Sequence, residues 1–341
     1  MTRFEADWLP YACDMNALAD VHSRDYLRKH VKTPLCEQYV AAGALCTLST
    51  NSECILDAAR RTFSRATGGS EPGRQQFSLR LWVDESDLTQ PAPPNPYLRG
   101  LDHLVYMGLD VRSSLLADLV SRRVIGRVSS AIASDTRYWT TTIFPMLMSV
   151  LAGSLGFVEL HASCVATGEE GLLLMGPGRS GKSTLAKAMS EAGFRILSDD
   201  RVFCSIRNEG LRAHGLPRPV KLRQDAGTWF EEFRDLQPSN VQNGEPVFHF
   251  DPEPSIPQPC EPNAVICLER VGDGCQISRM RQSEVRWRID SELLQETPKV
   301  MEGQQRVIDA LVEIPCWHLQ YGARPEAVVE HLSKFLPARL H

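Results

Sequence analysis

The residues best suited to chemistry in this chain lie in one short stretch, 176–184, which reads Gly-Pro-Gly-Arg-Ser-Gly-Lys-Ser-Thr. The apolar run at 172–175 before it indicates a short buried strand. Residues 185–192 after it are mostly good helix formers, and Gly193 is placed to end that helix. A glycine-rich loop between a strand and a helix turns backbone N–H groups and the positive end of the helix dipole toward an anion. The stretch therefore predicts a phosphate-binding loop.

The end of the loop indicates which phosphate compound it binds. Lys182 is placed to contact the β- and γ-phosphates of a nucleoside triphosphate, and the Ser183 hydroxyl is placed to bind Mg²⁺. The glycines alone also fit the dinucleotide pattern G-x-G-x-x-G, so a dinucleotide site or a chance match is the alternative. The sequence favours ATP and Mg²⁺ as cofactors, with the nucleotide bound by Gly176, Gly178, Arg179, Ser180, Gly181, Lys182, Ser183 and Thr184.

Two adjacent carboxylates, Asp199 and Asp200, follow the next predicted strand, residues 194–198. They are expected at the sheet edge where open α/β sheets bind ligands. One of them can hold Mg²⁺ while the other accepts the proton of an attacking hydroxyl, and capping of a turn is the alternative role. His161 lies on the strand expected before the one that leads into the loop, which makes it a candidate proton-handling residue. A lone histidine fits a packing role equally well.

A basic stretch follows the two acids, between residues 207 and 223. Arg218 lies between two prolines, where a stiff turn could hold it against a phosphate or an incoming peptide. Arg218 and Lys221 are therefore candidate clamp residues for phosphate or substrate. A solvated surface explains both residues as well as a clamp does.

Composition excludes several other functions. The net charge of −5 argues against a nucleic-acid partner. The ten cysteines include no CxxC pair and the N-terminus has no apolar signal core, so we expect reduced thiols and a cytoplasmic location. The apolar run at 143–158 contains Pro145 and two glycines and is shorter than the ~20 residues of a membrane span. We expect a buried helix there and no membrane association.

The length of 341 residues allows two domains. We predict an N-terminal domain over 1–150 that supports the fold or recruits a substrate, and a nucleotide-binding domain over 151–341. Within the first, we predict a helix in 16–29, a half-buried strand at 77–83, a proline-rich linker at 91–96, an amphipathic helix at 115–124 and a polar strand or loop at 129–142. Within the second, we predict an extended loop at 251–262, strands at 264–268 and 314–321, and helices at 300–312 and 325–336.

The order of three motifs resembles that of HPr kinase/phosphorylase-like proteins, which share their nucleotide fold with phosphoenolpyruvate carboxykinases. These motifs are Leu-His161-Ala-Ser, the phosphate-binding loop, and Leu197-Ser-Asp-Asp. Within that group, the chain looks most like the kinases encoded with lasso-peptide and similar ribosomal-peptide pathways, because segments 216–222 and 264–270 are also similar. The resemblance covers roughly residues 150–336. The glycine-rich signature that bifunctional members carry after the paired acids has no counterpart here, which leaves phosphorolysis without support.

The resemblance implies an α/β fold, with a P-loop nucleotide-binding domain like the C-terminal domain of HPr kinase and a smaller α+β N-terminal domain. It also implies roles for residues at matching positions: Lys182 on the phosphates, Ser183 on the metal, Asp199 on Mg²⁺ through water, Asp200 as base on a seryl hydroxyl, and His161 beside Asp200.

We therefore predict an ATP- and Mg²⁺-dependent kinase that phosphorylates a serine of a ribosomally made precursor peptide or protein, with a homo-oligomer as a possible assembly. The first alternative is a kinase for free serine or another small molecule. The second is a nucleotide-binding regulatory module without transfer activity.

Overall fold

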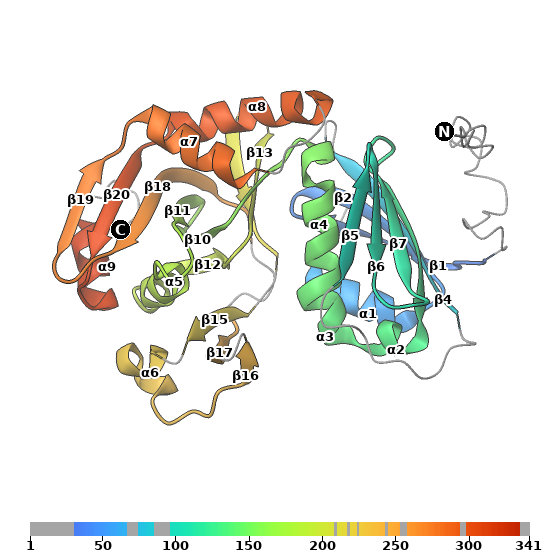
Figure 1. The fold of residues 1–341 in the computed structure, drawn as a ribbon, viewed down its shortest axis with the longest axis horizontal. Coiled ribbons are helices and arrows are strands. Elements are labelled where there is room, and N and C mark those ends of the chain that lie inside the picture. Colours follow the sequence, from blue (N-terminus) through green and yellow to red (C-terminus); the bar gives the residue numbers. More distant parts are fainter. Residues whose placement is uncertain are drawn as a thin grey trace, which may run out of the picture.

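The computed structural model describes residues 31–66, 74–84, 96–207, 210–216, 219–223, 225–242, 245–252, 258–293 and 298–334. Within these ranges the chain forms two bodies that lie side by side, one built on an eight-stranded sheet and the other on a six-stranded sheet (Figure 1). The helix predicted in 16–29 and all but the last residue of the linker predicted at 91–96 lie outside the described residues.

The N-terminal body is a mixed sheet packed against helices. Its strands run in the order β3-β1-β2-β4-β8-β7-β6-β5. Their bounds are β1 Leu35–Ala41, β2 Ala44–Thr50, β3 Ser64–Arg65, β4 Gln76–Asp84, β5 Tyr97–Leu101, β6 Leu104–Gly108, β7 Ser114–Asp118 and β8 Arg123–Ser129. The helical segments are α1 Glu53–Thr62, α2 Ser130–Ser134, α3 Thr136–Tyr138, the π-helix Trp139–Ile143, α4 Phe144–Ala152 and the 3₁₀ turn Gly153–Leu155. The strand predicted at 77–83 is confirmed as β4.

The helix predicted at 115–124 is wrong. These residues form β7 and the start of β8, which pair as an antiparallel hairpin. Leu115, Ala117 and Val124 are buried, and Leu115 and Ala117 alternate with less buried neighbours along β7. The leucines and alanine favour a helix locally, but pairing with β6 on the other side fixes this segment as a strand.

The polar strand or loop predicted at 129–142 is also wrong, because the segment is helical. Ser129 Oγ accepts a hydrogen bond from the backbone N–H of Ile132 at 3.3 Å, and Asp135 Oδ1 accepts one from that of Tyr138 at 2.9 Å. Each side chain satisfies an N–H group at the start of a short helix. The capping residues that made the segment look polar are thus the ones that begin its helices.

The C-terminal body is built on the sheet β12-β10-β11-β18-β20-β19. Its elements are β10 Ala162–Thr167, β11 Glu170–Met175, α5 Lys182–Glu191, β12 Arg195–Ser198, β18 Glu261–Arg270, β19 Cys275–Arg279, α7 Gln282–Glu292, α8 Pro298–Glu313, β20 Cys316–Tyr321 and α9 Pro325–Ser333. Leu172 and Leu174 of β11 pack in a core with α5 and α9, while Leu173 and Met175 pack in a second core with α7 and α8. The apolar run before the loop is therefore a central strand that is buried on both faces.

Strand directions bring the predicted functional segments to one edge of this sheet. β10 runs antiparallel to both β11 and β12, with Ala162 opposite Met175 and Cys164 opposite Ser198. The residue before β10 and the residues that follow β11 and β12 therefore lie at the same edge. These residues are His161, the phosphate-binding loop and the paired acids.

Two three-stranded sheets complete the fold. One, β14-β13-β9, consists of β9 Val158–Leu160, β13 Val202–Arg207 and β14 Gly210–His214. The other, β15-β17-β16, consists of β15 Val220–Arg223, β16 Asn240–Gln242 and β17 Glu245–Phe250, with α6 Ala226–Trp229 and the 3₁₀ turn Glu231–Phe233 between β15 and β16. Phe157, Phe203 and Leu216 join the core of the N-terminal body, and the domain boundary placed at residue 150 stays a prediction.

The loop predicted at 251–262 ends earlier than expected, because Glu261 and Pro262 already belong to β18. Pro262 pairs opposite Gly171, where the register of β11 and β18 shifts, and proline is tolerated at such an irregularity. Residues 253–257 lie outside the described part of the chain. The run at 143–158 is confirmed as a buried helix over α4, and none of the helices in the described ranges is both long and apolar enough to cross a membrane.

Candidate active site

The loop between β11 and α5 requires glycine at two positions. Gly176 has φ 151° and Gly181 has φ 92°, both in the region that favours glycine. A Cβ atom at Gly176 would lie 2.6 Å from Ser180 Oγ, and one at Gly181 would overlap the Tyr321 hydroxyl. Tyr321 Oη also donates a hydrogen bond to the backbone carbonyl of Ser180 at 2.7 Å, so β20 supports the loop from below.

Lys182 is the first residue of α5, and its side chain is almost fully buried. Its Nζ donates to the backbone carbonyl of Gly176 at 2.7 Å and to that of Pro177 at 3.4 Å. The ammonium group is thus held over the loop, among the backbone groups that would surround a phosphate. Ser180 Oγ is buried without a hydrogen-bond partner among the described residues, although Ser180 lines the cavity. A buried hydroxyl without a partner is expected in a loop whose groups donate hydrogen bonds to phosphate oxygens.

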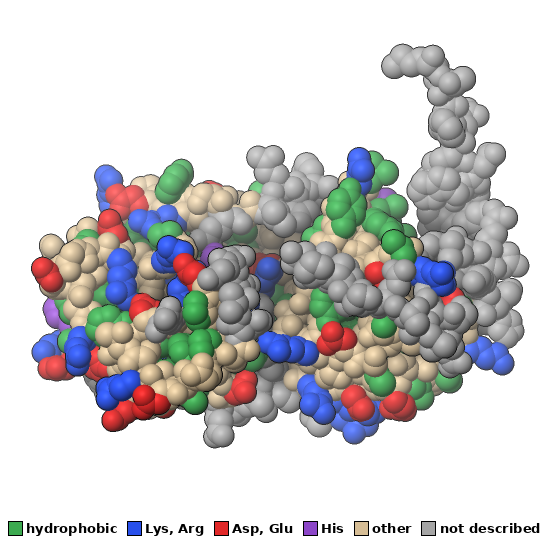
Figure 2. All heavy atoms as spheres, turned by 60° about the horizontal axis from the view of Figure 1, so that its bottom comes forward, with side chains coloured by type: hydrophobic (Ala, Val, Ile, Leu, Met, Phe, Trp, Pro, Cys, Tyr) green, Lys and Arg blue, Asp and Glu red, His purple; other side chains and the backbone are tan. Residues whose placement is uncertain are grey.

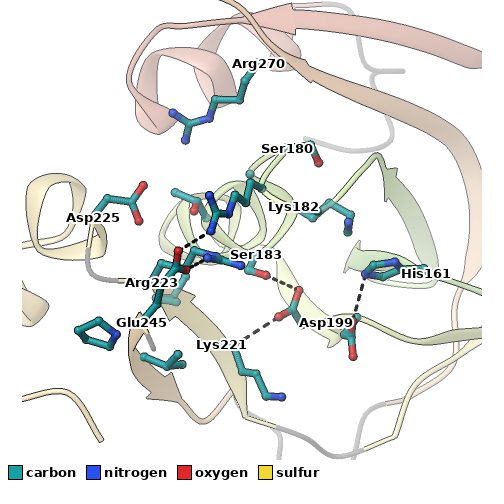
Figure 3. A pocket seen from close by; sticks show the side chains of 18 residues that line it. His161, Ser180, Lys182, Ser183, Asp199, Lys221, Arg223, Asp225, Glu245 and Arg270 are labelled. Atoms are coloured by element: carbon teal, nitrogen blue, oxygen red, sulfur yellow. Dashed lines mark hydrogen bonds and ion pairs between the residues drawn. The ribbon is translucent and has the colours of Figure 1, made fainter. Parts of the chain in front are cut away.

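Asp199 is buried and held by three donors. It accepts a hydrogen bond from Ser163 Oγ at 2.5 Å. It also accepts hydrogen bonds from Ser183 Oγ at 3.0 Å and from the backbone N–H of Lys221 at 3.4 Å (Figure 3). Burial raises the pKa of the Asp199 carboxyl, and the hydroxyls of Ser163 and Ser183 oppose that rise. The carboxylate is therefore fixed in place beside the first turn of α5.

Ser183 and Asp199 offer adjacent oxygen atoms to a metal ion. No cluster of three or more His, Cys, Asp or Glu residues suited to a metal occurs in the described ranges. A metal here would take its remaining ligands from water and phosphate oxygens, which is how Mg²⁺ usually binds in phosphoryl-transfer sites. The residues present therefore fit Mg²⁺ bound together with a nucleotide.

Asp200 differs sharply from its neighbour. Its side chain is 46% exposed, and its Oδ1 lies 3.1 Å from His161 Nε2. Its φ of 85° is unusual for a residue other than glycine. The turn that imposes this conformation is closed by Ser198 Oγ, which donates to the backbone carbonyl of Arg201 at 2.5 Å. Left-handed backbone held by its surroundings is often found at functional sites.

These groups line one cavity of about 810 Å³ (Figure 3). Its far wall is formed by β15 and β17, which contribute Lys221, Arg223 and Glu245 to the lining. Glu245 forms ion pairs with Arg223 and with Arg179 of the loop. Arg270, at the end of β18, lies above the loop with its guanidinium 5.3 Å from the ring centroid of Tyr321.

The structure brings together most of the residues singled out in the sequence. His161, Asp199, Asp200, Lys221 and residues 178–184 all line the cavity, while Gly176 contributes a carbonyl beneath it. His161 lies in the bend between β9 and β10 and not within a strand. Arg218 lies outside the described residues.

Several residues at the site were not anticipated. Ser163 follows His161 by two positions in the same motif, and that spacing along a strand was the available signal. Arg270 and Tyr321 come at the ends of strands β18 and β20, which run parallel to β11, so strand order could have indicated them. Glu245 carries no local signal, because the pairing of β15 with β17 alone brings it to the loop.

Comparisons with known proteins add little. No protein-family model matches the chain, and no curated protein matches it. Among solved structures, the Hpr(Ser) kinase/phosphatase from Coxiella burnetii is similar over 52% of this chain and 97% of its own, with 14% sequence identity and a TM-score of 0.27. A likeness at that level decides neither the activity nor the substrate.

Proposed function

We propose that this protein is an ATP- and Mg²⁺-dependent kinase that transfers the γ-phosphoryl group to a serine hydroxyl of a peptide or protein. One observation carries the proposal. A phosphate-binding loop, a buried carboxylate beside its serine and an exposed carboxylate paired with histidine all face the same cavity. Bound ATP and Mg²⁺ would supply the phosphoryl group and the charge that neutralises it.

The chain's own residues would position the nucleotide. The backbone N–H groups of the loop and Lys182 would hold the phosphates, and Ser183 and Asp199 would hold the metal beside them. Ser163 keeps Asp199 in place from β10 through a buried hydrogen bond. Since phosphoryl transfer needs little covalent chemistry from the protein, this positioning and neutralisation would supply most of the rate enhancement.

Asp200 would act on the acceptor. Its exposed carboxylate would accept the proton of the serine hydroxyl as the hydroxyl oxygen bonds to phosphorus and the bond to the leaving phosphate breaks. His161 would orient Asp200, since the two side chains already lie 3.1 Å apart. Asp199 is poorly suited to this role because it is 5% exposed and already accepts three hydrogen bonds.

A peptide is the acceptor we favour, of the ribosomally made, lasso-type precursor class that the sequence resemblance implies. Asp200 and His161 have exposed fractions of 46% and 54%, so an acceptor that is too large to be enclosed could still reach them. A free-serine kinase would be expected to enclose its substrate.

Mass spectrometry after incubation with ATP and Mg²⁺ tests the proposal. The acceptors are free serine, a generic seryl peptide and a short peptide encoded next to this gene. Asp200→Asn should lower the rate at which the phosphate adduct forms by about 100-fold or more, whereas Asp290→Asn, an equal change on exposed α7, should leave that rate unchanged. An adduct on free serine alone would identify a metabolite kinase. Nucleotide binding without any adduct would instead support a regulatory module.

A further inference from the structure

Arg201 directly follows Asp200, and its guanidinium binds side chains from two other elements. Its Nη1 donates hydrogen bonds to Glu159 Oε1 at 2.6 Å and to Ser149 Oγ at 2.5 Å. Ser149 Oγ in turn donates to Glu159 Oε1 at 2.9 Å. Arg201, Glu159 and Ser149 therefore form a closed group, in which each side chain is bonded to the other two.

This group of three connects the two bodies of the fold. Ser149 lies on α4 in the N-terminal body, and Glu159 lies on β9. β9 pairs with β13, which begins one residue after Arg201. Figure 1 shows α4 on the side of the N-terminal body that faces the C-terminal body. Arg201 therefore ties the segment that carries Asp200 to the neighbouring body.

Two ionic contacts join the same two segments of the chain. β9 and β13 are antiparallel neighbours. At the end of this ladder Arg201 pairs with Glu159 at 2.6 Å, and Asp200 Oδ1 lies 3.1 Å from His161 Nε2. Because one peptide bond separates Asp200 from Arg201, a shift of the Arg201 backbone would also move the Asp200 carboxylate relative to His161.

The backbone at Asp200 requires support of this kind. Its φ of 85° is rarely adopted by residues other than glycine, and such a conformation persists only where the surrounding structure imposes it. The hydrogen bond from Ser198 Oγ holds the backbone carbonyl of Arg201, while Glu159 and Ser149 hold its side chain. Arg201 is thus anchored through both its backbone and its side chain.

An ion pair alone would not distinguish Arg201 from other surface arginines. On the face in Figure 2, Lys and Arg side chains are interspersed with Asp and Glu, and exposed ion pairs usually contribute little. The pair of Arg201 with Glu159 differs because Glu159 is only 22% exposed and Ser149 binds both partners. A carboxylate and a hydroxyl on two separate elements suit the planar guanidinium, which has several donors in fixed directions.

We propose that Arg201 is a positioning residue, which keeps the Asp200 carboxylate beside His161 and so makes α4 of the N-terminal body part of the catalytic arrangement. Arg201 acts only through Asp200. The effect on catalysis rests on the proposed function, in which Asp200 is the base. The effect on structure, that Arg201 holds Asp200 near His161, does not depend on phosphoryl transfer.

Steady-state kinetics of the full-length chain test the effect on catalysis, with the acceptor that takes up phosphate in the experiment above. Arg201→Gln should lower kcat about tenfold or more and leave the KM for ATP unchanged, because a small displacement of a reacting group is costly while the phosphate-binding loop is untouched. Glu159→Gln should act in the same way. The double variant should be no slower than Arg201→Gln alone, since both changes break one contact.

Arg286→Gln is the matched control. Arg286 of α7 pairs with Asp309 of α8 at 2.8 Å, and its exposed fraction of 38% is close to the 40% of Arg201. Its replacement should leave kcat unchanged. In a chain that transfers phosphate, an Arg201→Gln variant as fast as this control would overturn the inference, and so would a loss confined to the KM for ATP.

Two-dimensional NMR spectra of the histidine ring nitrogens test the effect on structure without any turnover. His161→Gln assigns the Nε2 resonance of His161, and Asp200→Asn shows how that resonance shifts when the carboxylate is lost. Arg201→Gln should shift it in the same direction, whereas Arg286→Gln should leave it in place. An unchanged resonance in Arg201→Gln would overturn the inference. A wild type that transfers no phosphate would refute the proposed function alone, and these spectra would then decide the role of Arg201.

Discussion

Gly181→Ala should destabilise the protein and distort the loop that the proposed function depends on. Gly181 has φ 92°, and alanine in left-handed backbone is less stable by roughly 1–2 kcal/mol. The new methyl group would also overlap the Tyr321 hydroxyl, and overpacking of this kind typically costs roughly 1–3 kcal/mol. Together these effects predict a loss of roughly 2–5 kcal/mol in the free energy of unfolding.

Urea unfolding followed by tryptophan fluorescence measures this loss, and titration with a non-hydrolysable ATP analogue measures the effect on the loop. Gly178→Ala is the matched control. Gly178 has no positive φ, and no atom lies within 4 Å of a Cβ built there, so its replacement should be nearly neutral in stability. The same substitution three residues apart in one loop thus separates strain from a general effect of losing glycine.

Tyr321→Phe isolates the steric part of the loss. Alone it removes the hydrogen bond to Ser180, which should cost about 1 kcal/mol. Combined with Gly181→Ala, it removes the atom that the methyl group overlaps. The double variant should therefore lose less free energy of unfolding than the two single variants together, by roughly 1–3 kcal/mol. Strictly additive effects, or a Gly181→Ala protein as stable as the control, would refute the packing described here.

Four further outcomes are expected. Lys182→Ala should abolish ATP binding. Asp200→Asn should leave ATP binding largely intact and lower the rate of phosphoryl transfer by about 100-fold or more. Equilibrium binding and kinetic assays measure these two effects separately. Ser163→Ala should weaken Mg²⁺-dependent nucleotide binding about tenfold, measured by metal titration, because Asp199 loses a supporting donor. The folded pKa of His214, about 3, lies below its unfolded value of 6.5, so its contribution to stability is complete above pH 6.5 and falls by about 1.4 kcal/mol per pH unit below it. Urea unfolding at about pH 7.0 and about pH 5.5 measures this effect. The wild type should lose more free energy of unfolding between the two pH values than the His214→Gln variant does.

The phosphate-binding loop could be located from sequence because its requirements are local. A buried strand, glycines at fixed spacing and a helix start occur within twenty consecutive residues or so, and each reports on backbone conformation directly. The structure adds the reason why two of these positions need glycine. A side chain at position 176 would collide with Ser180, and one at position 181 would collide with Tyr321. Tyr321 is remote in sequence, so no local pattern shows this constraint.

The wrong assignments at 115–124 and 129–142 have a common cause. Leu115, Leu116 and Ala117 have helix-forming propensity, but β7 is held by neighbours on both sides, and pairing with β6 and β8 outweighs that local preference. In the second segment, Ser129 and Asp135 suggested a loop because they are polar. Reading them as N-caps would have predicted the helices that they begin.

The paired acids show where sequence reasoning ends. Asp199 and Asp200 are adjacent and chemically identical, so only their surroundings can assign them different roles. Asp199 continues from β12 into the interior, where two serine hydroxyls and a backbone N–H bind it. The left-handed turn at Asp200 points the next carboxylate outward, toward His161. A buried carboxylate that accepts three hydrogen bonds suits a metal, whereas an exposed one that lies beside a histidine can still approach an acceptor hydroxyl. The division of labour therefore depends on one backbone torsion, which the sequence does not reveal.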